Sequence, residues 1–237
     1  MNATTTGDNN IAIGASAGDA LTSGKGNVIM GASNAGGAVN TGAYNTILGN
    51  NAGESLTDGW ANIIIGQGAG TTTTSVNNAT IIGREAATGG NITSAADYTV
   101  AVGREALRAL TSGPGNVAVG YYAGGSITTG AANVAFGSGS LKTNIDGSYN
   151  TAIGNLALET FEADSANHGE NTAVGWKAAA NLTTATNIVA IGAKAMGTGT
   201  VTGDSSVAIG YNAGAALTSG HNNVIMGTNA AKLLTTG

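Results

Sequence analysis

Asn116-Val117-Ala118-Val119-Gly120 decides the fold, because stretches like it occur thirteen times along the 237 residues. Their closing glycines are Gly14, Gly31, Gly49, Gly66, Gly83, Gly103, Gly120, Gly137, Gly154, Gly175, Gly192, Gly210 and Gly227. Eight of the twelve intervals between these glycines are 17 residues, and the others are 18, 20, 21 and 18. A near-constant period is typical of a solenoid, in which each coil packs only on its neighbours. We therefore predict a β-dominated repeat solenoid of about thirteen coils of 17 residues.

Two columns of the repeat have a structural interpretation. The glycine, as at Gly14, Gly31, Gly120 and Gly154, suits a positive-φ turn or a close approach of two backbones. The residue four before it is Asn in nine repeats, including Asn27, Asn116 and Asn150. We expect a stacked Asn column to bond amide to amide from coil to coil.

The three residues between Asn and Gly predict a short parallel strand. The first and third should face one way and the second the other. The third is always apolar, the first is Val, Ile or Thr, and the middle one is Ala or Ile, as at Ala118 and Ala152. Both faces are therefore suited to burial. One should fill the interior and the other should meet the same strand of another chain, with the middle Ala/Ile column as the expected seam.

The segment after the glycine completes the coil. Ala stands three residues after the glycine in eleven repeats, and Leu, Ile or Phe stands seven after it in eight. This spacing suits a helical turn that ends at a glycine, and a second short strand is the alternative.

Composition excludes several classes of function. The net charge of −5, with eight Lys and Arg in all, argues against nucleic acid as a partner. No apolar run is long enough for membrane insertion. Cysteine is absent, and the two histidines lack an orienting carboxylate placed by the repeat. We expect no enzyme activity, no cofactor and no metal site.

We predict one continuous solenoid over 1–237, with the repeats spanning 7–237. The repeats open at Thr5-Thr6-Gly7 and close at Thr235-Thr236-Gly237 in the same repeat phase, which suggests a fragment, a cleaved product or a unit that continues end to end. Longer loops are expected within 86–98 and 158–170, where the period lengthens. The second carries Glu162, Asp164 and His168 in an acidic cluster, which indicates receptor contact, a cation site or a tolerated insertion.

Aromatic residues are few. Tyr121, Trp176 and Tyr211 directly follow the repeat glycine, and Trp60 lies near the start of a strand. These rings either contact a glycan or receptor, or pack over the small side chains of adjacent coils.

Asn150-Thr151-Ala152-Ile153-Gly154, together with Ala-Gly-x-x-Leu-Thr-Ser-Gly at 213–220, resembles repeats in the tail fibres of tailed phages. The chain is similar, more distantly, to the head repeats of trimeric autotransporter adhesins. The resemblance implies a parallel homotrimer, attachment to a host-surface glycan or protein receptor, and a location on the virion surface or otherwise outside the cell. In such fibres a self-cleaving chaperone domain follows.

The leading hypothesis is therefore a structural and adhesive fibre segment. The alternatives are an ice-binding solenoid that uses a Thr column and a self-assembling extracellular filament. That column would include Thr57, Thr128, Thr183 and Thr218. Glycan hydrolysis is a further hypothesis, and it would need paired carboxylates in one groove, for which the acidic insertion is the only candidate.

Overall fold

The computed structural model describes residues 6–163 and 168–236, in two compact units, Met1–Asn116 and Val117–Gly237. The first unit contains β1 (Ile11–Ile13), β2 (Val28–Met30), β3 (Thr46–Leu48), β4 (Ile63–Ile65), β5 (Thr80–Ile82), the 3₁₀ helix η1 (Ser94–Ala96) and β6 (Val100–Val102). The second contains β7 (Val117–Val119), β8 (Val134–Phe136), β9 (Thr151–Ile153), β10 (Thr172–Val174), β11 (Val189–Ile191), β12 (Val207–Ile209) and β13 (Val224–Met226). In the described residues no helix is long and apolar enough to span a membrane.

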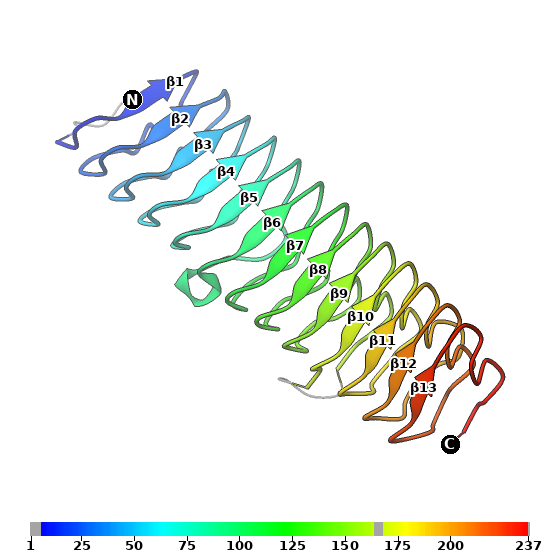
Figure 1. Ribbon diagram of the computed structural model, residues 1–237. Coiled ribbons are helices and arrows are strands. Elements are labelled where there is room, and N and C mark those ends of the chain that lie inside the picture. The colour runs from blue at the N-terminus through cyan, green and yellow to red at the C-terminus, as the bar shows by residue number, and fades with distance from the viewer. Residues whose placement is uncertain (1–5, 164–167, 237) are drawn as a thin grey trace. The chain divides into compact units, whose positions relative to one another are not determined.

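Each unit is a β-solenoid, as the period predicts. Figure 1 shows that each strand is followed by a loop that returns the chain beside its own start, so that the next strand lies alongside. Within each unit neighbouring strands are parallel and in register, with Ala12 opposite Ile29 and Ile29 opposite Ile47. A coil therefore places equivalent residues of successive repeats in columns.

The middle strand residue points into the coil, not toward another chain. The side chains of Ile47 and Ala152 are fully buried, together with Ala52 and Leu56 from the turns behind the strand. The prediction that the middle Ala/Ile column forms an oligomer seam is therefore wrong. Side chains alternate along a strand, so the first and third residues point outward once the second fills the interior.

The segment after the glycine is neither the predicted helical turn nor a second strand. In the third coil the amides of Ala52 and Leu56 close two turns by donating to the carbonyls of Gly49 and Gly53, at 3.3 and 3.1 Å. The amides of Gly53 and Ser55 donate instead to the next coil, at 2.8 and 3.1 Å. Because alternate amides are used between coils, no run of i→i+4 bonds can form.

Left-handed backbone makes these turns possible. Two residues of the segment, the second and fourth after the repeat glycine, have positive φ in nearly every coil, as at Glu105 (57°) and Leu107 (48°). Only an isolated bridge between Leu182 and Val201 resembles the second strand in the part of the chain that the structure describes. The apolar spacing of four thus arises from two consecutive turns that both direct their last side chain inward.

The repeat glycine is required by contact between coils. Gly120 has a φ of +137°, and a Cβ placed there would lie 2.7 Å from the carbonyl carbon and oxygen of Gly137. Any side chain would separate the two coils at the end of the strand. The same contact recurs at equivalent glycines of both units, such as Gly49 and Gly154, and explains why glycine stands there.

The Asn column forms the predicted amide ladder inside each unit. The Asn45 side chain donates from Nδ2 to Asn27 Oδ1 (3.1 Å) and to the Gly59 carbonyl (2.8 Å). Its Oδ1 accepts from the backbone N–H and from Nδ2 of Asn62, at 3.0 and 2.9 Å. Asn133, Asn150 and Asn171 repeat the pattern in the second unit. The ladder satisfies polar groups that the solenoid buries, which is what a buried polar group requires.

We predict that Asn45→Ala lowers the free energy of unfolding by about 3 kcal/mol, because it leaves several buried donors and acceptors without partners. Urea denaturation followed by circular dichroism measures the change. The exposed Asn50 lies in the following turn, and Asn50→Ala should change stability by less than about 0.5 kcal/mol. Equal effects of the two substitutions would show that the ladder does not stabilise the coil.

Candidate functional site

The outward side of the strands is apolar in both units. We define the strand face of a unit as the first and third residues of its strands. Every one of these positions holds Val, Ile, Leu, Met, Phe or Thr, so none of the chain's eight Lys and Arg or thirteen Asp and Glu lies there. Several are strongly exposed, including Ile63 (41%), Phe136 (55%) and Ile153 (40%). An exposed, uncharged and largely apolar surface of this kind is typical of an interaction site.

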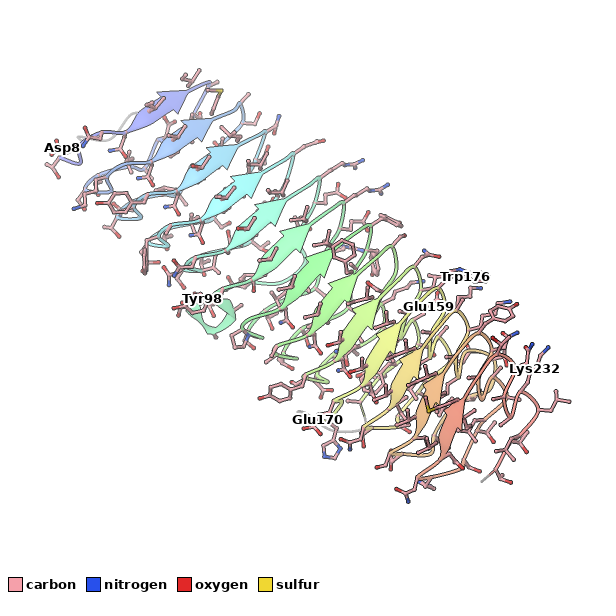
Figure 2. All side chains as sticks on the ribbon, in the orientation of Figure 1. Asp8, Tyr98, Glu159, Glu170, Trp176 and Lys232 are labelled. Carbon is pink, nitrogen blue, oxygen red and sulfur yellow. The ribbon has the colours of Figure 1, made fainter. Side chains whose placement is uncertain are left out.

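The turns after the repeat glycines carry many of the charged side chains and three exposed aromatic rings. We define the turn edge as the first five residues after each repeat glycine. Figure 2 shows two of its residues, Glu159 and Trp176, in the second unit beyond the carboxyl ends of the strands, with Glu170 on the opposite side. Charged side chains are therefore separated from the strand face by position in the coil.

The three aromatic residues that follow repeat glycines are all exposed on the turn edge: Tyr121 is 51%, Trp176 45% and Tyr211 48% exposed. The ammonium groups of Lys194 and Lys177 lie 4.9 and 5.5 Å from the centroid of the Trp176 ring. The three rings occur in different coils, so the structure does not gather them into one cluster. Tyr121 instead lies beside Tyr122, with their ring centroids 6.2 Å apart.

Trp60 belongs to the first unit and lies before β4. It is 50% exposed, and its backbone N–H donates to Asn77 Oδ1 at 3.0 Å. Tyr44, at a neighbouring repeat position, has the Lys25 ammonium 5.9 Å from its ring centroid. Both rings are exposed on the first unit.

The acidic insertion holds only part of the predicted cluster in contact. Glu162 Oε2 accepts the backbone N–H of Ile145 at 2.9 Å. Burial raises the pKa of Glu162, the bond to Ile145 opposes the rise, and the nearby Asp146 carboxylate adds to it. Asp164 lies outside the described residues. Within 6–163 and 168–236, no three Asp, Glu or His side chains are grouped as metal ligands would be.

His168 is exposed. It lines a hollow of about 200 Å³ with Gly169, Glu170, Thr186 and Asn187. The other histidine, His221, accepts the backbone N–H of Asp204 at its Nδ1, at 3.0 Å. His221 therefore bonds to the neighbouring coil, as the polar residues of the ladder do.

The Thr column is used for bonds between coils. Thr57 Oγ1 donates to the Thr74 carbonyl at 3.0 Å, and Thr218 Oγ1 donates to the Thr235 carbonyl at 2.8 Å. Thr128 and Thr183 make the same bond at 3.3 Å. A hydroxyl whose proton is directed to a carbonyl of its own chain has less capacity to order external water. This observation weighs against the ice-binding hypothesis.

Sequence reasoning missed a second hollow, on the turn edge of the second unit. It has a volume of about 210 Å³ and is lined by Tyr121, Tyr122, Ser138, Gly139, Lys142 and Leu156. The available signal was a column: the second residue after the repeat glycine is Tyr122, Gly139 and Leu156 in three successive coils. The glycine in that column removes a side chain between two large ones.

No protein-family model, curated protein or solved structure matches this chain. The strand face and the turn edge are the two candidate interaction surfaces of the chain.

We predict that Glu162→Gln raises the melting temperature at pH 7.5, because Gln keeps an oxygen for the Ile145 N–H and removes a charge that burial disfavours. A carboxyl group whose pKa is raised on folding stabilises the fold most below its unfolded pKa and loses this contribution as pH rises through its folded pKa. The advantage of Gln should therefore vanish below the ordinary pKa of 4.5. Thermal scans from pH 3.5 to 8 measure it.

The exposed Glu170 provides the control, and Glu170→Gln should leave the melting temperature unchanged across this range. An advantage of Glu162→Gln that persisted at pH 3.5 would contradict the electrostatic explanation.

Proposed function

We propose that this chain is a segment of a structural and adhesive fibre in which three parallel copies associate through their strand faces. The single observation that carries the proposal is the absence of charge from an exposed strand face in every described coil. Burial of apolar surface is the main driving force of protein association. The turn edges, which carry most of the Lys and Arg side chains and three exposed rings, would then remain accessible for attachment.

The partner that best fits the strand face is another copy of the same chain. The face repeats at the spacing of the coils, and a parallel copy in register offers an apolar strand at each level. A three-fold axis in front of the strand face would bring the same outward columns of the three chains together. The resemblance to phage tail-fibre repeats supports the same assembly.

The proposed role includes a location on a virion surface or elsewhere outside the cell, with a surface glycan or protein receptor as the attachment target. The repeated coil supports a mechanical role, since stability in a solenoid is distributed over many similar interfaces. The structural use of the Thr hydroxyls and of His221 supports this role over ice binding and over hydrolysis.

We predict that light scattering of the purified chain gives a mass about three times 22.8 kDa. Phe136→Glu should shift the mass toward that of one chain, because it introduces a charge into the strand face. Ile153→Glu, in the next coil, should do the same, with circular dichroism reporting whether each variant still folds.

The matched control is Thr184→Glu, which introduces the same charge at an exposed turn residue. This variant should keep the mass of the unmodified protein. A mass near 22.8 kDa for the unmodified protein would overturn the proposal, and so would dissociation by Thr184→Glu alone.

A further inference from the structure

The hollow on the turn edge of the second unit is produced by one glycine. Tyr122, Gly139 and Leu156 occupy the same repeat position in three successive coils, so their side chains would form a continuous column. Gly139 interrupts this column, and a Cβ at Gly139 would lie 2.8 Å from Leu156 Cδ2. The floor of the hollow is therefore backbone at Gly139, with an aromatic wall on one side and an aliphatic wall on the other.

The aromatic wall is held in place before any ligand arrives. The ring of Tyr122 lies directly against Gly125, where an added Cβ would collide with it. The backbone N–H of Gly125 also donates to the Tyr122 carbonyl at 3.3 Å, and Gly139 N–H donates to the Tyr121 carbonyl at 2.9 Å. A wall fixed in this way loses little conformational entropy on binding, which favours recognition by a small site.

One charged side chain, Lys142, lines the hollow, and its ammonium group is paired with the carboxylate of Glu159. The Lys142 ammonium lies 3.6 Å from Glu159 Oε1, and both side chains are partly exposed. Ser138 and the two tyrosines also line the hollow, and their side chains carry hydroxyl groups that can donate and accept hydrogen bonds. A ligand that fits must present a flat apolar face to a ring and several hydrogen-bonding groups around its edge.

These features select among ligand classes. The small volume excludes a lipid chain or a peptide helix, and the acidic Glu159 beside Lys142 disfavours phosphate and carboxylate groups. The Lys142 ammonium disfavours a cationic ligand. A neutral sugar ring satisfies the remaining requirements, because its C–H face packs on an aromatic ring while its hydroxyl groups reach the rim.

We propose that this hollow binds one ring of a neutral saccharide. The site deepens the attachment role of the proposed function, yet its described walls all belong to one chain and lie off the strand face. It therefore does not depend on whether three copies associate. Repetition of the site in an assembly would raise the avidity for a surface that displays many such sugars.

Saturation-transfer NMR on the full chain tests the proposal, with galactose, glucose, mannose, N-acetylglucosamine and N-acetylneuraminic acid as separate probes. At least one neutral sugar should receive saturation at its ring protons, with a dissociation constant on the order of millimolar. Tyr122→Ala should reduce the signal at least about tenfold, since the stacking wall is lost. Gly139→Ala should also weaken it, because the added methyl group must displace the Leu156 side chain that forms the aliphatic wall.

Tyr121→Ala and Tyr211→Ala form the matched pair, because both tyrosines follow a repeat glycine and are about equally exposed, at 51% and 48%. Tyr121→Ala should weaken the signal and Tyr211→Ala should leave it unchanged, whereas general loss of folding would affect both. Neither substitution should alter the mass by light scattering, so failure here is distinguishable from failure of the proposed assembly. Absence of transfer to every neutral probe, a stronger signal from N-acetylneuraminic acid, or a signal that survives Tyr122→Ala would overturn the proposal.

Discussion

Hydrogen bonding between successive coils at a nearly fixed spacing is the constraint on which the rest of the structure depends. Backbone amides of the strand, of the turns and of the Asn column donate to groups one coil away, as Asn62 N–H does to Asn45 Oδ1. These bonds fix the register, and the register places equivalent side chains in columns. Glycine must stand where two coils touch, at Gly120 and its equivalents, because the bonds leave no space for a side chain there. A requirement of the backbone thus determines which residue types the repeat can hold.

The same constraint explains which features were predictable from the sequence. The strand and the Asn ladder follow from residue types that suit them, Val-Ala-Ile and Asn, at a spacing that the glycines set. The conformation of the turns could not be predicted in this way, because residues such as Leu107 and Glu105 adopt a left-handed backbone conformation that nothing in their chemistry favours. The cost of about 1 kcal/mol or more for each such residue is offset by hydrogen bonds and packing between coils, which are visible only in three dimensions. The spacing of the apolar residues therefore predicted a helical turn where the structure has two tight turns.

The structure was also needed to decide which strand residues point inward and which point outward. Alternation shows that Ala152 and Ile153 face opposite ways, but both are apolar, so the pattern cannot say which one is internal. The turn residues decide, since Ala52 and Leu56 close the interior against the middle strand residue of their coil. The candidate sites, likewise, could be predicted only in part from the sequence. Single exposed rings could be identified in the sequence, whereas the hollow beside Tyr122 arises from a missing side chain in the next coil.

Oxidative cross-linking of single-cysteine variants tests the central claim most directly, which is that the outward strand residues of identical chains face one another. The chain has no cysteine of its own, so each variant reports one position. In a parallel assembly in register, Ile153→Cys brings equivalent residues of different chains together and should yield covalent dimers, since a disulfide needs Cα atoms about 4.4–6.8 Å apart. Ala152→Cys, buried inside the coil, should yield none. Cross-linking at Ala152→Cys, or none at Ile153→Cys, would contradict the account.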